Sequence, residues 1–182
     1  MLIKPDVVYR AYNSIEKSEN SKVIYLTPQG QKLDQKKVEE LAKCDQIILL
    51  CGHYEGIDQR VIEKIAPEEI SIGDYVLTGG EIPAMVLIDS VSRFVEGVLS
   101  EGSTDNETFT DGLLEYSQYT KPEIFEEKMV PEVLISGHHK NIEIWRRHSS
   151  LENTYLKRPE LLEKAKLSDD DRKYLEELKE RK

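Results

Sequence analysis

The chain has 182 residues, 38% hydrophobic and 33% charged, enough for one ordinary globular domain with a small helical addition. Its net charge of −10 argues against indiscriminate binding to nucleic acid but leaves room for a local basic patch. No apolar run reaches the length of a membrane span, and the first residues lack a signal-peptide core. Cys44 and Cys51 lie in or beside apolar runs, as reduced core thiols of a cytoplasmic protein would.

Short apolar runs alternate with helical patterns through the first half of the chain. Three runs predict buried strands, at residues 23–26, 46–51 and 69–77. Four stretches have helical spacing of apolar residues, at 5–17, 33–42, 59–65 and 84–95. The alternation predicts an α/β fold with a mostly parallel sheet and helices on both of its faces.

A loop follows each of the three predicted strands, at Thr27–Gly30, Gly52–Gly56 and Thr78–Gly80. The carboxyl ends of parallel strands share one edge of a sheet, and ligands bind at that edge in open α/β folds. Glycine also lets a ligand approach bare backbone N–H groups. The loops match neither a dinucleotide fingerprint nor a P-loop. We expect a ligand site there; a turn that needs glycine only for its geometry is the alternative.

The second half of the chain is more polar. Residues 96–120 are irregular and long for a loop, which indicates a linker or a lid, and Val133–Lys140 is expected to be a turn. From Asn141 onward the pattern is helical, with an interruption at Pro159 and a charged amphipathic helix at the end. Cations gather in this acidic chain's C-terminal part, at Lys140, Arg146, Arg147, Lys157 and Arg158.

Five motifs occur in a fixed order: Tyr25-Leu-Thr-Pro-Gln-Gly30, Leu50-Cys-Gly-His-Tyr-Glu-Gly-Ile-Asp58, Ser71-Ile-Gly-Asp-Tyr-Val-Leu-Thr-Gly-Gly-Glu81, Asp111-Gly-Leu-Leu-Glu115 and Val133-Leu-Ile-Ser-Gly-His-His139. Together they resemble the bacterial tRNA (guanine-N1)-methyltransferases, which use S-adenosylmethionine to methylate the guanine just 3′ of the anticodon. The resemblance implies a trefoil-knotted SPOUT methyltransferase domain followed by a small helical domain. The implied boundaries are a knotted cofactor-binding domain at 1–99, a flexible linker at 100–114 and a tRNA-binding domain at 115–182.

The resemblance implies that S-adenosylmethionine sits in a bent form within the knot. Glu115 matches an acidic residue that the family's partner subunit places near the methionine amine. Family members also bind magnesium, although the sequence offers no clear metal site beyond scattered carboxylates. The expected cofactor residues from the three loops are Tyr25, Leu26, Thr27, Pro28, Gly52, Tyr54, Glu55, Ser71, Ile72, Gly73, Tyr75, Val76, Leu77, Gly79, Gly80 and Pro83.

Two catalytic roles follow from the resemblance. Arg93 matches an arginine whose guanidinium, placed at guanine O6, would stabilise the charge that builds as N1 loses its proton. The carboxylate that takes this proton falls in Asp105-Asn-Glu-Thr-Phe109, where the family reads Glu-Asp-Ser-Phe. Alignment on Phe109 gives Glu107 as the base, and a shifted register gives Asp105.

The resemblance also implies partners and departures. A homodimer is expected, with active sites shared between protomers, and tRNA phosphates would meet the basic C-terminal segment, including Trp145. His53 and His138 stand where the family has Arg and Asn. The family has a further segment before the position of Met1, carrying a strand and a basic loop, so an exposed sheet edge is expected.

Two other functions remain open at this point. The chain could be a truncated, inactive fragment that binds the cofactor or tRNA. It could instead be a related knotted RNA methyltransferase with another target. The Gly52–Asp58 and Asp111–Glu115 motifs speak against the second alternative.

Overall fold

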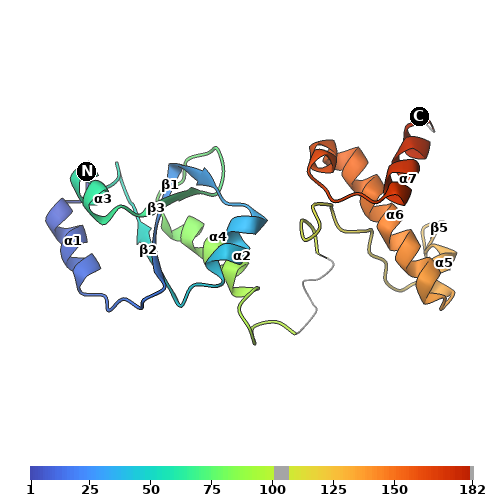
Figure 1. Cartoon of the computed structure of the whole chain (residues 1–182), viewed down its shortest axis with the longest axis horizontal. Helices are drawn as coiled ribbons and strands as arrows, with labels where there is room; N and C mark the ends of the chain where they lie inside the picture. The colour runs from blue at the N-terminus through green and yellow to red at the C-terminus, as the bar shows by residue number, and fades with distance from the viewer. Residues whose placement is uncertain (101–106, 181–182) are drawn as a thin grey trace. The chain divides into compact units, whose positions relative to one another are not determined.

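A computed structural model describes residues 1–100 and 107–180, and the chain divides into two compact units, Met1–Glu101 and Gly102–Lys182 (Figure 1). The elements of the first unit are α1 (Pro5–Asn13), β1 (Ser21–Lys32), α2 (Gln35–Leu41), β2 (Gln46–Cys51), α3 (Gln59–Ile65), β3 (Glu68–Ser71) and α4 (Glu81–Ser92). Those of the second unit are β4 (Ile124–Phe125), β5 (Lys128–Met129), α5 (Glu132–Ile135), α6 (His139–Lys157), the 3-10 helix η1 (Pro159–Glu163) and α7 (Asp169–Glu180).

The sheet of the first unit has the strand order β2-β1-β3, and both neighbours of β1 run parallel to it. Ile24 in the central strand pairs with Leu49 on one side and with Glu68 on the other. The predicted mixed α/β fold with a parallel sheet is therefore confirmed. The trefoil knot stays a prediction.

Helices cover both faces of this sheet, as the alternating pattern predicts (Figure 1). On one face α2 and α4 pack against β1 and β3, around Ile24, Leu26, Val38, Leu41, Ile70, Ala84, Leu87 and Val91. On the other face α1 and α3 pack together around Val8, Ile57, Val61 and Ile62. The two layers hold the bulge of β1 and the carboxyl ends of β2 and β3, where the expected ligand segments lie.

Several predicted boundaries are wrong, for local reasons. The first strand was expected to end at residue 26, before the loop Thr27–Gly30, but β1 continues to Lys32. Its register with β3 jumps from Leu26 to Gln31, so the residues between them form a bulge within the strand. β3 ends at Ser71 and does not continue to residue 77, because the Ser71 hydroxyl accepts a hydrogen bond from Gly73 N (3.2 Å) and starts a turn. The first helix ends at Asn13.

The second unit is built on the long helix α6, against which α7 and η1 pack. Its core contains Leu113, Leu151, Leu175 and Leu178, so Leu113 of the expected linker is buried here. The interruption at Pro159 and the terminal amphipathic helix are confirmed. The predicted turn at 133–140 is wrong in part, since α5 and the start of α6 occupy it. No helix in the described part of the chain is long and apolar enough to cross a membrane.

Candidate functional site

A cavity of about 220 Å³ opens at the bulge of β1 between Leu26 and Gln31 and at the loops that follow β2 and β3. Every residue of the first unit that the sequence assigned to the cofactor lines it, from Tyr25 to Pro83. Five further residues line the cavity that were not expected from the sequence, namely Gln29, His53, Gly56, Ile70 and Thr78. Gln29, His53, Gly56 and Thr78 lie within the loops that were singled out, so loop membership was the available signal.

Two glycines let backbone segments cross at this cavity. Gly80 donates its N–H to Gly52 O at 2.8 Å, and a Cβ on Gly80 would lie 2.7 Å from Cys51 Cα. A Cβ on Gly30 would lie 2.4 Å from the backbone of Glu69 and Ile70. Since real Cβ atoms do not approach other atoms so closely, only glycine fits at either crossing. The 79–80 segment is thereby held directly against the end of β2.

Two titratable side chains beside the cavity, Tyr25 and Cys51, stay neutral at ordinary pH. Burial, followed by the charge of Glu69, raises the pKa of the Tyr25 phenol. Burial, followed by the charge of Glu81, raises the pKa of the Cys51 thiol. The Tyr25 phenol is therefore a neutral hydrogen-bond donor in the cavity wall, and the carboxylate of Glu55 stands at the exposed side of the cavity.

His53 carries a buried polar atom at this wall. Its Nδ1 has no hydrogen-bond partner within the described residues and lies 3.9 Å from Glu81 Oε1. Its ring meets the Tyr54 ring edge-on, with centroids 4.3 Å apart. A buried nitrogen without a partner is unfavourable unless water or a ligand satisfies it. His53, which stands where the family has arginine, thus lies beside Gly79 with a nitrogen that is unpaired in the described part of the chain.

The expected catalytic residues lie outside this cavity. Arg93 is half-buried at the C-cap of α4, where its N–H donates to Val91 O, and it is not among the lining residues. Asp105 lies outside the described residues. Glu107 and Glu115 line a second cavity, of about 370 Å³, within the second unit. The structure therefore brings together the expected base and the expected amine-binding carboxylate, and Arg146 lies in the same wall.

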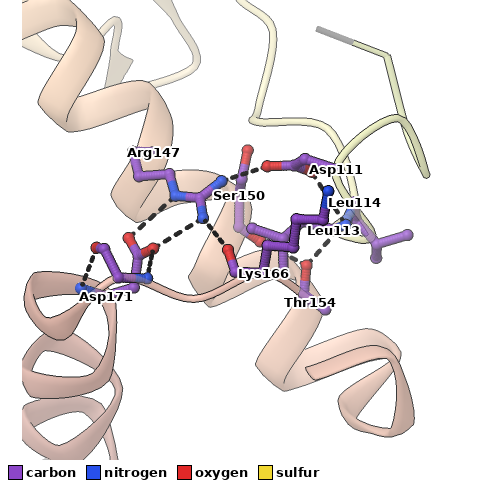
Figure 2. A network of polar contacts seen from close by, with 9 residues as sticks. Asp111, Leu113, Leu114, Arg147, Ser150, Thr154, Lys166 and Asp171 are labelled. Carbon is purple, nitrogen blue, oxygen red and sulfur yellow. Dashed lines mark hydrogen bonds and ion pairs between the residues drawn. The ribbon is translucent and has the colours of Figure 1, made fainter. Parts of the chain in front are cut away.

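Arg147 anchors the segment that carries these carboxylates (Figure 2). Its guanidinium donates to both oxygens of Asp171, at 3.0 and 2.8 Å, to Lys166 O and to Asp111. Asp171 in turn accepts from Ser168 N at 2.9 Å, while Ser168 Oγ accepts from Asp171 N, which forms a capping box for α7. Hydrogen bonding to Asp171 raises the pKa of Arg147. Burial opposes ionisation of Asp171, yet the bonds from Arg147 and Ser168 outweigh it and lower the pKa of Asp171.

Side chains of α6 hold the same segment by its backbone. Leu114 N donates to Thr154 Oγ1 at 2.9 Å, and Ser117 N donates to Ser149 Oγ at 3.0 Å. Asn153 Nδ2 donates to Glu115 O at 3.0 Å. Because Thr154 is fully buried, this docking fixes the position from which the Glu115 side chain projects.

The cations predicted to meet tRNA phosphates have different surroundings. Arg147 is engaged internally, as described, and Arg158 pairs with Glu160. The Arg146 guanidinium lies over the Tyr116 ring, at 4.8 Å from its centroid, while Lys140 and Lys157 are exposed on α6. Among the described residues, no group of three or more histidine, cysteine or acidic side chains is placed to hold a metal ion.

Comparison with known proteins gives a consistent family. A family profile described as tRNA (Guanine-1)-methyltransferase TrmD matches residues 1–164. Proteins named tRNA (guanine-N(1)-)-methyltransferase are similar to this chain. The one from Alkaliphilus oremlandii is 53% identical, with 100% of this chain and 76% of the relative covered.

Two more relatives of that name extend the comparison. The protein from Lachnoclostridium phytofermentans is 55% identical over 87% of this chain and 58% of its own length. The one from Ruminiclostridium cellulolyticum is 58% identical over 90% of this chain and 71% of its own length. The aligned region includes both cavities, so the chain belongs to the tRNA (guanine-1)-methyltransferase TrmD family.

Proposed function

We propose that this chain transfers a methyl group from S-adenosylmethionine to N1 of the guanine just 3′ of the anticodon in tRNA. The observation that carries the proposal is the cavity at the strand ends, whose lining contains all the expected first-unit cofactor residues. The names of the similar proteins support the reaction and the tRNA substrate. We also infer that the protein works in the cytoplasm, where tRNA is modified in bacteria.

The donor set of the cavity fits the proposed cofactor. Bare backbone at Gly52, Gly79 and Gly80 allows the close approach that adenine and carboxylate groups need for backbone hydrogen bonds. The unpartnered His53 Nδ1 offers one more polar contact. Bound there, S-adenosylmethionine would supply an electrophilic methyl group. The raised pKa of the Tyr25 phenol keeps this lining side chain from acting as a competing nucleophilic anion.

The protein's own residues divide the remaining work. Arg93, at the end of α4, is assigned to guanine O6, where a guanidinium stabilises negative charge as it develops. Glu107 is assigned to the N1 proton, and Asp105 is the alternative in the other register. Glu115, held by Asn153 and Gln118, is assigned to the methionine amine. The first unit thus supplies polarisation and the second unit supplies proton removal.

We infer further that the active protein is a homodimer with active sites shared between protomers. The outer face of α4 is apolar and exposed, with Ile82 at 53%, Met85 at 69% and Ile88 at 55% of their full accessibility. Exposed apolar patches of this kind mark association sites. Sedimentation equilibrium tests the inference, and Met85→Glu is expected to shift the protein toward the monomer.

The test of the proposed function has two parts, cofactor binding and product identity. Calorimetry on the wild-type chain should show S-adenosylmethionine binding, and Gly79→Val should abolish it. A Cβ there would lie 2.2 Å from Glu81 Oε2 and 2.6 Å from His53 Nδ1, so valine would displace these side chains and push into the cavity wall. Gly97→Asn is the matched control, because nothing lies within 4 Å of Gly97 and asparagine tolerates its positive φ.

Product identity is then read from nuclease digests of a tRNA transcript after incubation with the enzyme and cofactor. Mass spectrometry should find N1-methylguanine next to the anticodon. Glu107→Gln should lower kcat by roughly a hundredfold or more, the usual share of a general base. Methylation of another base, or the absence of methylation although the cofactor binds, would contradict the proposal.

A further inference from the structure

The second unit contains another cavity, of about 500 Å³, that the proposed function does not use. The rings of Tyr116, Tyr119 and Trp145 line it, together with the cations of Lys121 and Arg146. The rest of the wall is half apolar, from Val130, Leu134, Ile135 and Ile142, and half polar, from Ser117, Gln118, Thr120 and Glu123. Glu123 is the single acidic residue of this lining, so the wall is net positive within a chain of net charge −10.

The rings are arranged to receive a further flat group. Tyr119 and Trp145 meet at 62°, with centroids 6.0 Å apart, and Tyr119 keeps 49% of its accessibility. Arg146 covers the Tyr116 ring from the same wall. An exposed aromatic face next to cations is the arrangement that binds unpaired nucleotides, because bases stack on the ring and phosphates pair with the cation.

This aromatic cavity shares a wall with the carboxylate cavity of the same unit. Tyr116 and Arg146 line both, and Glu107 and Glu115 line the second. A nucleotide in the aromatic cavity would therefore be separated by one Arg–Tyr pair from the carboxylate assigned to the guanine N1 proton. Successive nucleotides of one strand can span such a separation when one base is turned away from the other.

We propose that the Tyr119–Trp145 cavity binds an unpaired nucleobase adjoining the target guanine of the tRNA. The base stacks on Tyr119 and Trp145, and its phosphate pairs with Arg146 or Lys121. This inference rests on the proposed function, since it takes tRNA as the substrate and Glu107 as the group nearest the target. It adds a second contact point, by which the enzyme reads the loop next to the methylated base.

The cavity carries its own reporter, because Trp145 is the only tryptophan of the chain. Titration of the full chain with an unmodified tRNA transcript should quench its tryptophan fluorescence. Two further transcripts each have one abasic nucleotide, on the 5′ or the 3′ side of the target guanine. One of them should lose most of the quenching. Equal quenching by all three transcripts, or none by the intact one, overturns the proposal.

A thermodynamic cycle gives an independent measure. Tyr119→Ala should raise the Kd for the intact transcript roughly tenfold, since stacking on an aromatic ring is usually worth that much. Tyr119→Ala should not change the Kd for the abasic transcript that fails to quench the Trp145 fluorescence, because that transcript lacks the base that would stack on Tyr119. Tyr119→Phe keeps the ring and should bind like wild type. Phe125→Ala is the control for an exposed aromatic residue of the same unit outside the cavity.

The two proposals fail in different ways. Additive effects of Tyr119→Ala and the abasic site show that the cavity does not hold that base, and they overturn the inference even if N1-methylguanine is formed. Coupled effects without N1-methylguanine instead support a tRNA contact at this cavity and remove the proposed methylation. The fluorescence titration needs no variant, so a misfolded Tyr119→Ala protein does not protect the inference.

Discussion

Each unit contains a cavity with polar groups in its wall, but the two walls are built from different parts of the chain. The cavity of the first unit includes bare backbone at Gly52, Gly79 and Gly80 in its wall, together with side chains such as the neutral Tyr25 phenol. The carboxylate cavity of the second unit is walled by charged side chains, including Glu107, Glu115 and Arg146. The structure around the cavity of the first unit should therefore be disturbed most by a larger side chain. The structure around the carboxylate cavity should be disturbed most by the loss of a charged side chain.

Removal of the Arg147 charge should have the largest effect on stability. Arg147→Met leaves the carboxylate of Asp171, which is 5% exposed, without its main partner. Loss of one member of a largely buried ion pair costs about 3 kcal/mol. We expect hydrogen exchange to accelerate in α6 and α7 but not in β1.

Arg172→Met is the matched control, because Arg172 lies on the exposed side of α7 next to Asp171. It should leave exchange in both units as in the wild type. If Arg147→Met accelerated hydrogen exchange equally in β1 and α6, the ion pair would not stabilise the second unit separately from the first.

An added methyl group tests the other side of the comparison. Gly80→Ala places a Cβ 2.7 Å from Cys51 Cα and 3.0 Å from Gly52 N, so the crossing segments must separate. Overpacking of this kind costs about 2 kcal/mol. The expected result is faster exchange at β2 and weaker S-adenosylmethionine binding in calorimetry, with exchange in α6 unchanged. Wild-type affinity would show that the crossing does not shape the cavity.

A single neutral hydrogen bond gives a smaller effect. Thr154→Val keeps the shape of a fully buried side chain but removes the hydroxyl that accepts from Leu114 N and donates to Ser150 O. The unpaired Leu114 N–H should cost about 1.5 kcal/mol. Exchange of the Leu114 amide should accelerate, whereas Thr154→Ser should preserve its protection. Unchanged protection in both variants would mean that α6 does not hold the segment through Thr154.

The sequence predicted the first unit better than the second. Its apolar strand runs and its glycine-containing loops can be recognised from a few neighbouring residues. A parallel sheet then brings these loops to the same edge of the sheet. The crossings at Gly30 and Gly80 depend on segments far apart in the chain, so the glycines were visible but their contacts were not. The end of β3 was missed because the hydroxyl of Ser71 forms a turn with Gly73, which the apolar pattern of residues 72–77 conceals.

In the second unit, the position of the long helix was predictable and the network around it was not. Arg147 was counted among the phosphate-binding cations because its sequence neighbours are basic. Its partners Asp111 and Asp171 are distant in sequence and meet it only after folding. The β4–β5 hairpin and α5 were also missed, since elements of two to four residues carry too few positions for a period to show.

Acid should weaken the Asp171 network of the second unit, as the mildest test of the comparison. The folded state lowers the pKa of Asp171 through Arg147 and Ser168, so its contribution to stability is fully present above the unfolded pKa, about 3.9. That contribution should fade as pH drops through the lower folded pKa. Urea titrations monitored by hydrogen exchange in α7 give the free energy of unfolding of wild type and of Asp171→Asn. The difference between the two values should shrink from pH 6 toward pH 3. A constant difference would mean that the charge of Asp171 is not what the network stabilises.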